Sequence, residues 1–144
     1  MGIYCRTPEE GLGNWAVSVG AVVATKGIYW MNIICFGDSN TYGYDPRSYL
    51  GGRYDADSRW VDILAAKTGW TVRNMGENGR EIPTLAPDFP ADTDLLIVMM
   101  GTNDLLQGKS PGQAAVRLER FLSGICLERS KLLLIAPPPV QRGA

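Results

Sequence analysis

The sequence predicts an α/β fold, a three-layer α/β/α sandwich around a parallel, flavodoxin-like sheet. From Met31 onward, short apolar runs alternate with segments of helical periodicity. The apolar runs are continuous, as expected for strands covered on both faces. Strands that alternate with helices form parallel sheets through right-handed crossovers. A length of 144 residues suits a single domain.

Four strands are predicted: the apolar runs at residues 33–36, 95–100 and 132–136, and a brief strand at residues 70–73. The run from Leu95 to Met100 is the strongest because all six residues are apolar. Three consecutive prolines at 137–139 end the last strand, since proline cannot donate to a strand ladder.

Two helices follow from capping signals and from apolar spacing. Ser58 is the predicted cap of a helix that ends at Gly69 and carries one face made of Trp60, Ile63, Leu64 and Lys67. Ser110, Pro111 and Gln113 predict a second helix that starts with a capping box. Its predicted buried stripe is Ala115, Leu118, Leu122 and Ile125.

The composition assigns residues 1–30 to an amino-terminal extension outside the fold, and residues 31–144 to the domain. Fourteen basic and fifteen acidic side chains leave the chain near neutral, which argues against a nucleic-acid or membrane-surface partner. No apolar run approaches the ~20 residues of a membrane span. The predicted location is cytoplasmic, and secretion is the alternative.

Two polar motifs follow predicted strands directly. Gly37-Asp38-Ser39-Asn40 follows the first strand, and Gly101-Thr102-Asn103-Asp104 follows the third. Ligand sites in such sheets lie beyond the carboxyl ends of the strands, so Ser39 and Asn103 are expected at the same edge. A serine nucleophile needs a base to take its proton, and its tetrahedral intermediate needs hydrogen-bond donors. The backbone of Ser39, the backbone of Gly79 and the amide of Asn103 are the predicted donors.

These motifs resemble the SGNH (GDSL-type) hydrolases. The first block of that family matches Gly37-Asp38-Ser39, and the following Thr41-Tyr42-Gly43-Tyr44 points toward its arylesterase and acyltransferase-like branch. The second block matches residues 74–79, with Gly79 as the oxyanion glycine, and the third matches residues 101–104, with Asn103 as the side-chain donor. The resemblance implies a serine esterase that acts on small acyl esters or thioesters, with no metal or organic cofactor.

The D-x-x-H block, which carries the base of the family, has no counterpart, because the chain contains no histidine. We expect the chain to be a truncated hydrolase, inactive by itself. A dedicated pseudoenzyme and a different base are the other two explanations. The alternative function is a non-catalytic acyl- or carbohydrate-binding module on the same fold.

The neighbours of these motifs have less specific interpretations. Asp38 is expected to bond local loop backbone, and Asp104 to be structural. Arg80 is expected to face solvent and not to bind substrate. Tyr42 and Tyr44 are candidate substrate-binding residues, although they can equally pack the long loop against the body of the domain. The loop from Asp45 to Asp57 follows the nucleophile and is expected to select the substrate.

Overall fold

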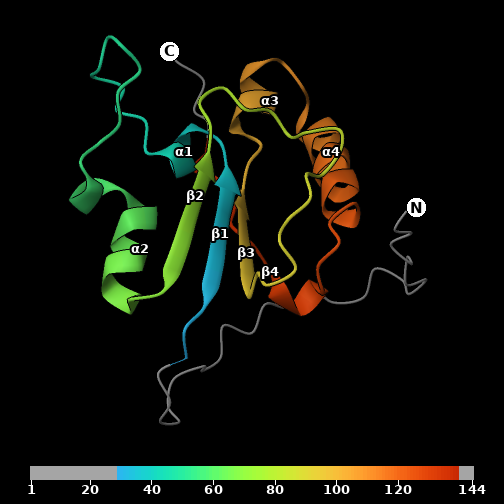
Figure 1. The fold of residues 1–144 in the computed structure, drawn as a ribbon. Coiled ribbons are helices and arrows are strands. Elements are labelled where there is room, and N and C mark those ends of the chain that lie inside the picture. The colour runs from blue at the N-terminus through green and yellow to red at the C-terminus, as the bar shows by residue number, and fades with distance from the viewer. Residues whose placement is uncertain (1–28, 140–144) are drawn as a thin grey trace.

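The computed structural model describes residues 29–139, and within them a parallel four-stranded sheet forms the middle layer (Figure 1). The strand order is β2-β1-β3-β4. The strands are β1 (Asn32–Gly37), β2 (Thr71–Gly76), β3 (Leu95–Met99) and β4 (Leu132–Leu134). The predicted extension over residues 1–30 lies outside the described residues, except for Tyr29 and Trp30.

Helices cover both faces of this sheet, which confirms the predicted three layers (Figure 1). Successive side chains of β1 point to opposite faces: Phe36 packs toward α4 (Pro111–Ser123), and Cys35 packs toward α2 (Trp60–Thr68). Burial raises the pKa of the Cys35 thiol to about 12, so this cysteine is a protonated core residue. The buried members on the α4 side are Ile34, Phe36, Ile82, Leu96, Val98, Met100, Phe121 and Ile125.

Helix α2 ends as predicted but begins differently. Gly69 follows its last residue with a φ of 71°, a left-handed conformation that glycine adopts at little cost. The prediction that Ser58 caps this helix is wrong. Ser58 belongs instead to the short 3₁₀ helix η1 (Ala56–Ser58), and Arg59 stands at the cap position without a side-chain hydrogen bond. The backbone N–H of Ser58 donates to Asp55, so this residue closes the preceding turn.

Helix α4 has the predicted capping box. The Ser110 hydroxyl accepts a hydrogen bond from the Gln113 backbone at 3.2 Å, and the Gln113 side chain accepts one from the Ser110 backbone at 2.8 Å. The predicted stripe is out of phase at its start, because Ala114 is buried and Ala115 is exposed. Phe121 determines which face of α4 is buried. It is fully buried against the sheet and lies outside the predicted stripe.

Replacing Ser110 by alanine is expected to lower the free energy of unfolding by ~1 kcal/mol, because an N-cap bond to an otherwise unpaired amide is lost. Urea denaturation followed by circular dichroism measures the change. The control is Ser123→Ala at the other end of α4, whose hydroxyl donates to the already bonded helix carbonyl of Glu119. Equal effects of the two substitutions would contradict the capping role.

The topology brings the polar motifs to one edge. From β1 the chain reaches β2 on one side and then β3 on the other, so the strand order reverses between β1 and β3, the place where such sheets bind ligands. Two short helices that the sequence analysis missed begin there, α1 (Ser39–Tyr42) after β1 and α3 (Thr102–Leu106) after β3. In the part of the chain that the structure describes, no helix is long and apolar enough to cross a membrane.

Candidate active site

Ser39 is the first residue of α1 and is half-buried at the carboxyl end of β1. The preceding residue, Asp38, is fully buried and caps the helix. Its Oδ1 accepts hydrogen bonds from the backbone and side-chain amides of Asn40, at 2.9 and 3.0 Å. Asp38 therefore makes the local backbone bond that was predicted for it. The N–H of Ser39 has no acceptor within the helix, as for any first helical residue.

Two glycines allow α1 to lie directly on the strand ends. A Cβ atom at Gly37 would lie 2.1 Å from the Thr41 hydroxyl oxygen, and one at Gly76 would lie 2.1 Å from the Tyr42 backbone nitrogen. No real Cβ atom tolerates such distances. The sequence indicates Gly37 only as a member of the motif, because its packing role depends on contacts that the sequence does not display.

The loop after β2 approaches the same place. Asn74 donates to the Thr41 carbonyl at 2.8 Å and accepts from the Gly76 amide at 2.9 Å, so it links β2 to α1. Gly79 follows in a turn, with a φ of 75° and an exposed backbone. A positive φ favours glycine at this position.

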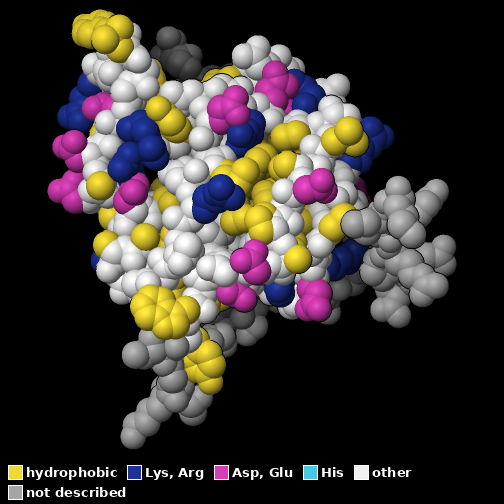
Figure 2. All heavy atoms as spheres, in the orientation of Figure 1, with side chains coloured by type: hydrophobic (Ala, Val, Ile, Leu, Met, Phe, Trp, Pro, Cys, Tyr) yellow, Lys and Arg dark blue, Asp and Glu magenta, His cyan; other side chains and the backbone are white. Residues whose placement is uncertain are grey.

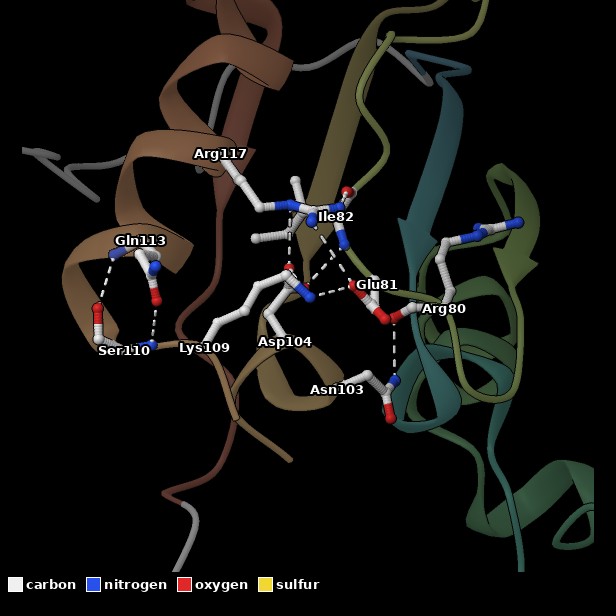
Figure 3. Close-up of polar contacts among 9 residues, drawn as sticks. All are labelled: Arg80, Glu81, Ile82, Asn103, Asp104, Lys109, Ser110, Gln113 and Arg117. Atoms are coloured by element: carbon white, nitrogen blue, oxygen red, sulfur yellow. Dashed lines mark hydrogen bonds and ion pairs between the residues drawn. The ribbon is translucent and has the colours of Figure 1, made fainter. Parts of the chain in front are cut away.

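Asn103 lies in α3 and reaches toward the Gly79 turn. Its side-chain nitrogen donates to the backbone carbonyl of Arg80 at 2.9 Å (Figure 3). An amide carries two N–H donors, so one remains for another acceptor. Asn40 bridges the other pair of segments, donating to the Thr102 hydroxyl at 3.4 Å. The segments that carry Ser39, Gly79 and Asn103 are therefore hydrogen-bonded to one another at one edge of the sheet.

Asp104 anchors this edge from behind. Its side chain is fully buried, and it accepts a hydrogen bond from the Ile82 backbone at 2.8 Å. Arg117 pairs with it at 3.2 Å, while Glu81 binds both Lys109 and Arg117 (Figure 3). The hydrogen bond from Lys109 is the main cause that lowers the pKa of Glu81 and keeps it ionised. Asp104 thus has the structural role that the sequence analysis assigned to it.

A pocket of about 400 Å³ opens beside Ser39. Tyr44 lines it, whereas Tyr42 is not among its lining residues and its ring lies under the Arg53 guanidinium, whose carbon is 4.6 Å from the ring centroid. Trp60 also lines this pocket, a position that no motif in the sequence indicates. The indole N–H of Trp60 donates to the Asn40 carbonyl at 3.1 Å. The lining residues are Ser39, Asn40, Gly43, Tyr44, Pro46, Tyr54, Ser58, Arg59 and Trp60.

The predicted substrate-selecting loop contributes Pro46 and Tyr54 to this pocket, and its middle projects from the body of the domain (Figure 1). Hydrophobic atoms gather at the projecting tip (Figure 2), where Tyr49 and Leu50 are almost fully exposed. Among residues 29–139, no group of three or more histidine, cysteine or acidic side chains is arranged to hold a metal ion.

The sequence of the chain matches one family model over most of its length. The GDSL-like lipase/acylhydrolase family matches residues 35–144, a range that includes all three motif segments. The chain belongs to this family. As a member of this family it carries segments that match the serine, glycine and asparagine blocks, but no histidine stands anywhere in its 144 residues.

Solved structures support the same family and fold. A proposed arylesterase from Agrobacterium tumefaciens str. C58 is similar with 27% identity and a TM-score of 0.57, covering 76% of this chain and 64% of its own. Est24, a carbohydrate acetylesterase from Sinorhizobium meliloti, has 26% identity and a TM-score of 0.57, covering 76% of this chain and 65% of its own. The GDSL-like chain thus spans less than two thirds of these proteins. No curated protein matches it.

Proposed function

We propose that the chain carries the nucleophile and the oxyanion donors of a serine esterase. Ser39 attacks the carbonyl carbon of a small acyl ester or thioester and forms an acyl-serine as the alcohol or thiol leaves. The Ser39 and Gly79 backbone amides and the Asn103 side chain donate to the oxyanion. One observation carries this proposal: the Asn103 amide is fixed by the Arg80 carbonyl, beside the Gly79 turn, at the edge where Ser39 begins α1.

The proton balance of this reaction requires a base. The Ser39 hydroxyl gives up a proton on attack, and the leaving group takes one. Histidine performs both transfers in the family to which the chain belongs, and this chain has none. We therefore propose that the chain alone is nearly inactive as an esterase.

The pocket chemistry indicates the kind of ester. Tyr44, Tyr54 and Trp60 offer aromatic surface, and Ser58 offers a hydroxyl, within a space of about 400 Å³. Such a lining suits an ester whose alcohol moiety is a ring and whose small acyl group lies at Ser39. The names of the similar structures, an arylesterase and a carbohydrate acetylesterase, agree with aryl and sugar esters respectively. Tyr42 does not line this pocket, so its contact with the substrate remains a prediction.

Transfer of an acetyl group to the chain tests the nucleophile. We expect p-nitrophenyl acetate to acetylate Ser39 slowly, and peptide mass spectrometry to locate one acetyl group there. The product is expected to accumulate because deacylation also needs the missing base. Ser39→Ala removes the label. Ser58→Ala is the control, since Ser58 lines the same pocket without the proposed role. Equal labelling of both variants would refute Ser39 as the nucleophile.

The absence of histidine also favours a second function, a non-catalytic acyl- or carbohydrate-binding module. The same experiment separates the two. Saturable binding of an intact acetylated sugar, without any acetyl transfer to Ser39, would favour the module.

A further inference from the structure

Arg80 is half-buried, although it was expected to face solvent. Only 18% of its side chain is exposed, and its guanidinium carbon lies 4.3 Å from the centroid of the Phe36 ring. Phe36 belongs to the core on the α4 side of the sheet. The prediction of a solvent-facing Arg80 is therefore wrong, because the planar guanidinium stacks on an aromatic ring while it bonds backbone carbonyls.

The side chain of Arg80 connects the ends of two strands. Its Nη1 donates to the carbonyl of Gly37, at the end of β1, at 3.1 Å, and to the carbonyl of Met75, near the end of β2. Nη2 pairs with Glu77. In Figure 3 the side chain extends away from Asn103 toward these strands. One guanidinium thus holds the strand ends from which the Ser39 and Gly79 segments depart.

The backbone of Arg80 holds the other part of the site. Its carbonyl accepts the hydrogen bond from the Asn103 amide, and its N–H closes the turn onto the Glu77 carbonyl at 3.3 Å. Gly79 lies inside this turn, and beyond its own residue and its two chain neighbours no atom lies within 4 Å of the position where its Cβ would be. The turn that carries Gly79 is therefore tied to the site by the two backbone hydrogen bonds of the residue that follows it.

We propose that Arg80 is a positioning residue for the oxyanion donors. Its guanidinium donates hydrogen bonds to the strand ends, and its backbone carbonyl accepts one from the Asn103 amide. These bonds fix Gly79 and Asn103 relative to Ser39. This proposal rests on the proposed function. Alanine at position 80 keeps the backbone carbonyl but removes the guanidinium that holds this residue to the strand ends. Lysine offers a single ammonium that cannot reproduce the planar set of donors.

The residual hydrolysis of p-nitrophenyl acetate by the chain is a suitable measure. When a triad lacks a member, the remaining acceleration of about 10³–10⁴ over water comes from the oxyanion hole and from binding, so it reports the donors and not the serine. We expect Arg80→Ala and Asn103→Ala each to lower this rate about 10²-fold, the effect of one lost donor. The double variant should be no slower than Asn103→Ala alone, since the two act as a unit. Methylguanidinium ion should restore the rate of Arg80→Ala.

A second measurement does not depend on activity. In the wild-type chain the Asn103 side-chain amide should exchange slowly with water in ¹⁵N NMR, and in Arg80→Ala it should exchange faster. If Arg80→Ala fails to fold, Arg80→Lys serves in its place, because it keeps the stem and the charge, and it should show the same two losses. Arg120→Ala, an exposed arginine in the last turn of α4, is the control and should change neither readout.

Unchanged hydrolysis and unchanged Asn103 exchange in both Arg80 variants would overturn the proposal. Additive effects of Arg80→Ala and Asn103→Ala would also overturn it. Failure of acetyl transfer to Ser39 would instead refute the proposed nucleophile, and the Asn103 exchange measurement would still decide the role of Arg80.

Discussion

The Gly37→Ala substitution is expected to lower the free energy of unfolding more than any other single change proposed for this chain. Its Cβ would lie 2.1 Å from the Thr41 hydroxyl oxygen and 2.5 Å from the Met99 carbonyl. Thr41 is 1% exposed, and Met99 is held in β3 beside the residue that changes, so neither can move freely. Overpacking of this kind costs about 3 kcal/mol, the upper end of its usual range, and this is a large part of the ~5–15 kcal/mol that stabilises a domain. Urea denaturation and near-ultraviolet circular dichroism measure the loss.

Gly112→Ala is the matched control for this substitution. Gly112 lies in the first turn of α4, and the nearest atom to a Cβ added there, the Ser110 hydroxyl oxygen, would be 4.0 Å away. Alanine at this position should leave stability unchanged or raise it by up to ~1 kcal/mol, because alanine is the better helix former. If Gly37→Ala unfolds at the same urea concentration as Gly112→Ala, α1 does not sit on the strand ends as described.

The second large effect is on the rate of ester hydrolysis by the chain, which has no histidine. We expect the purified chain to hydrolyse p-nitrophenyl acetate about 10⁶-fold more slowly than a complete family esterase assayed alongside it, because loss of the base alone costs this much. Ser39→Ala should leave the slow rate nearly unchanged, since a serine without its base contributes little. Turnover near that of the complete enzyme would mean that a residue other than histidine serves as the base.

The sheet and helix α4 were predictable because their signals are local. Continuous apolar runs mark β1 and β3, and Ser110 with Gln113 marks the start of α4 within three residues. The predictions were wrong where contacts between residues far apart in the sequence determine the structure. Phe121 sets the phase of α4 by packing against Phe36, and that contact joins positions far apart in the chain.

The candidate site was predictable as three motif segments, and not as an arrangement. The Ser39 and Asn103 segments each follow a strand, so the topology was enough to expect these two at one edge. The roles of Ser39, Gly79 and Asn103 remain predictions. Arg80 was misjudged because its partner Gly37 lies 43 positions away. No local pattern distinguishes an arginine that clamps two strand ends from one that faces water.

The measurement that tests the central claim most directly is rescue by an external base. Imidazole is added to the chain, to Ser39→Ala and to Asn103→Ala, and ester hydrolysis is corrected for imidazole alone. If only the base is missing, the wild-type chain should gain about tenfold or more, since general bases contribute about 10²–10⁴ when positioned. Ser39→Ala should gain nothing, and Asn103→Ala should gain far less than the wild-type chain. Equal gains in the wild-type chain and Ser39→Ala would contradict the claim that Ser39 is a nucleophile awaiting its base.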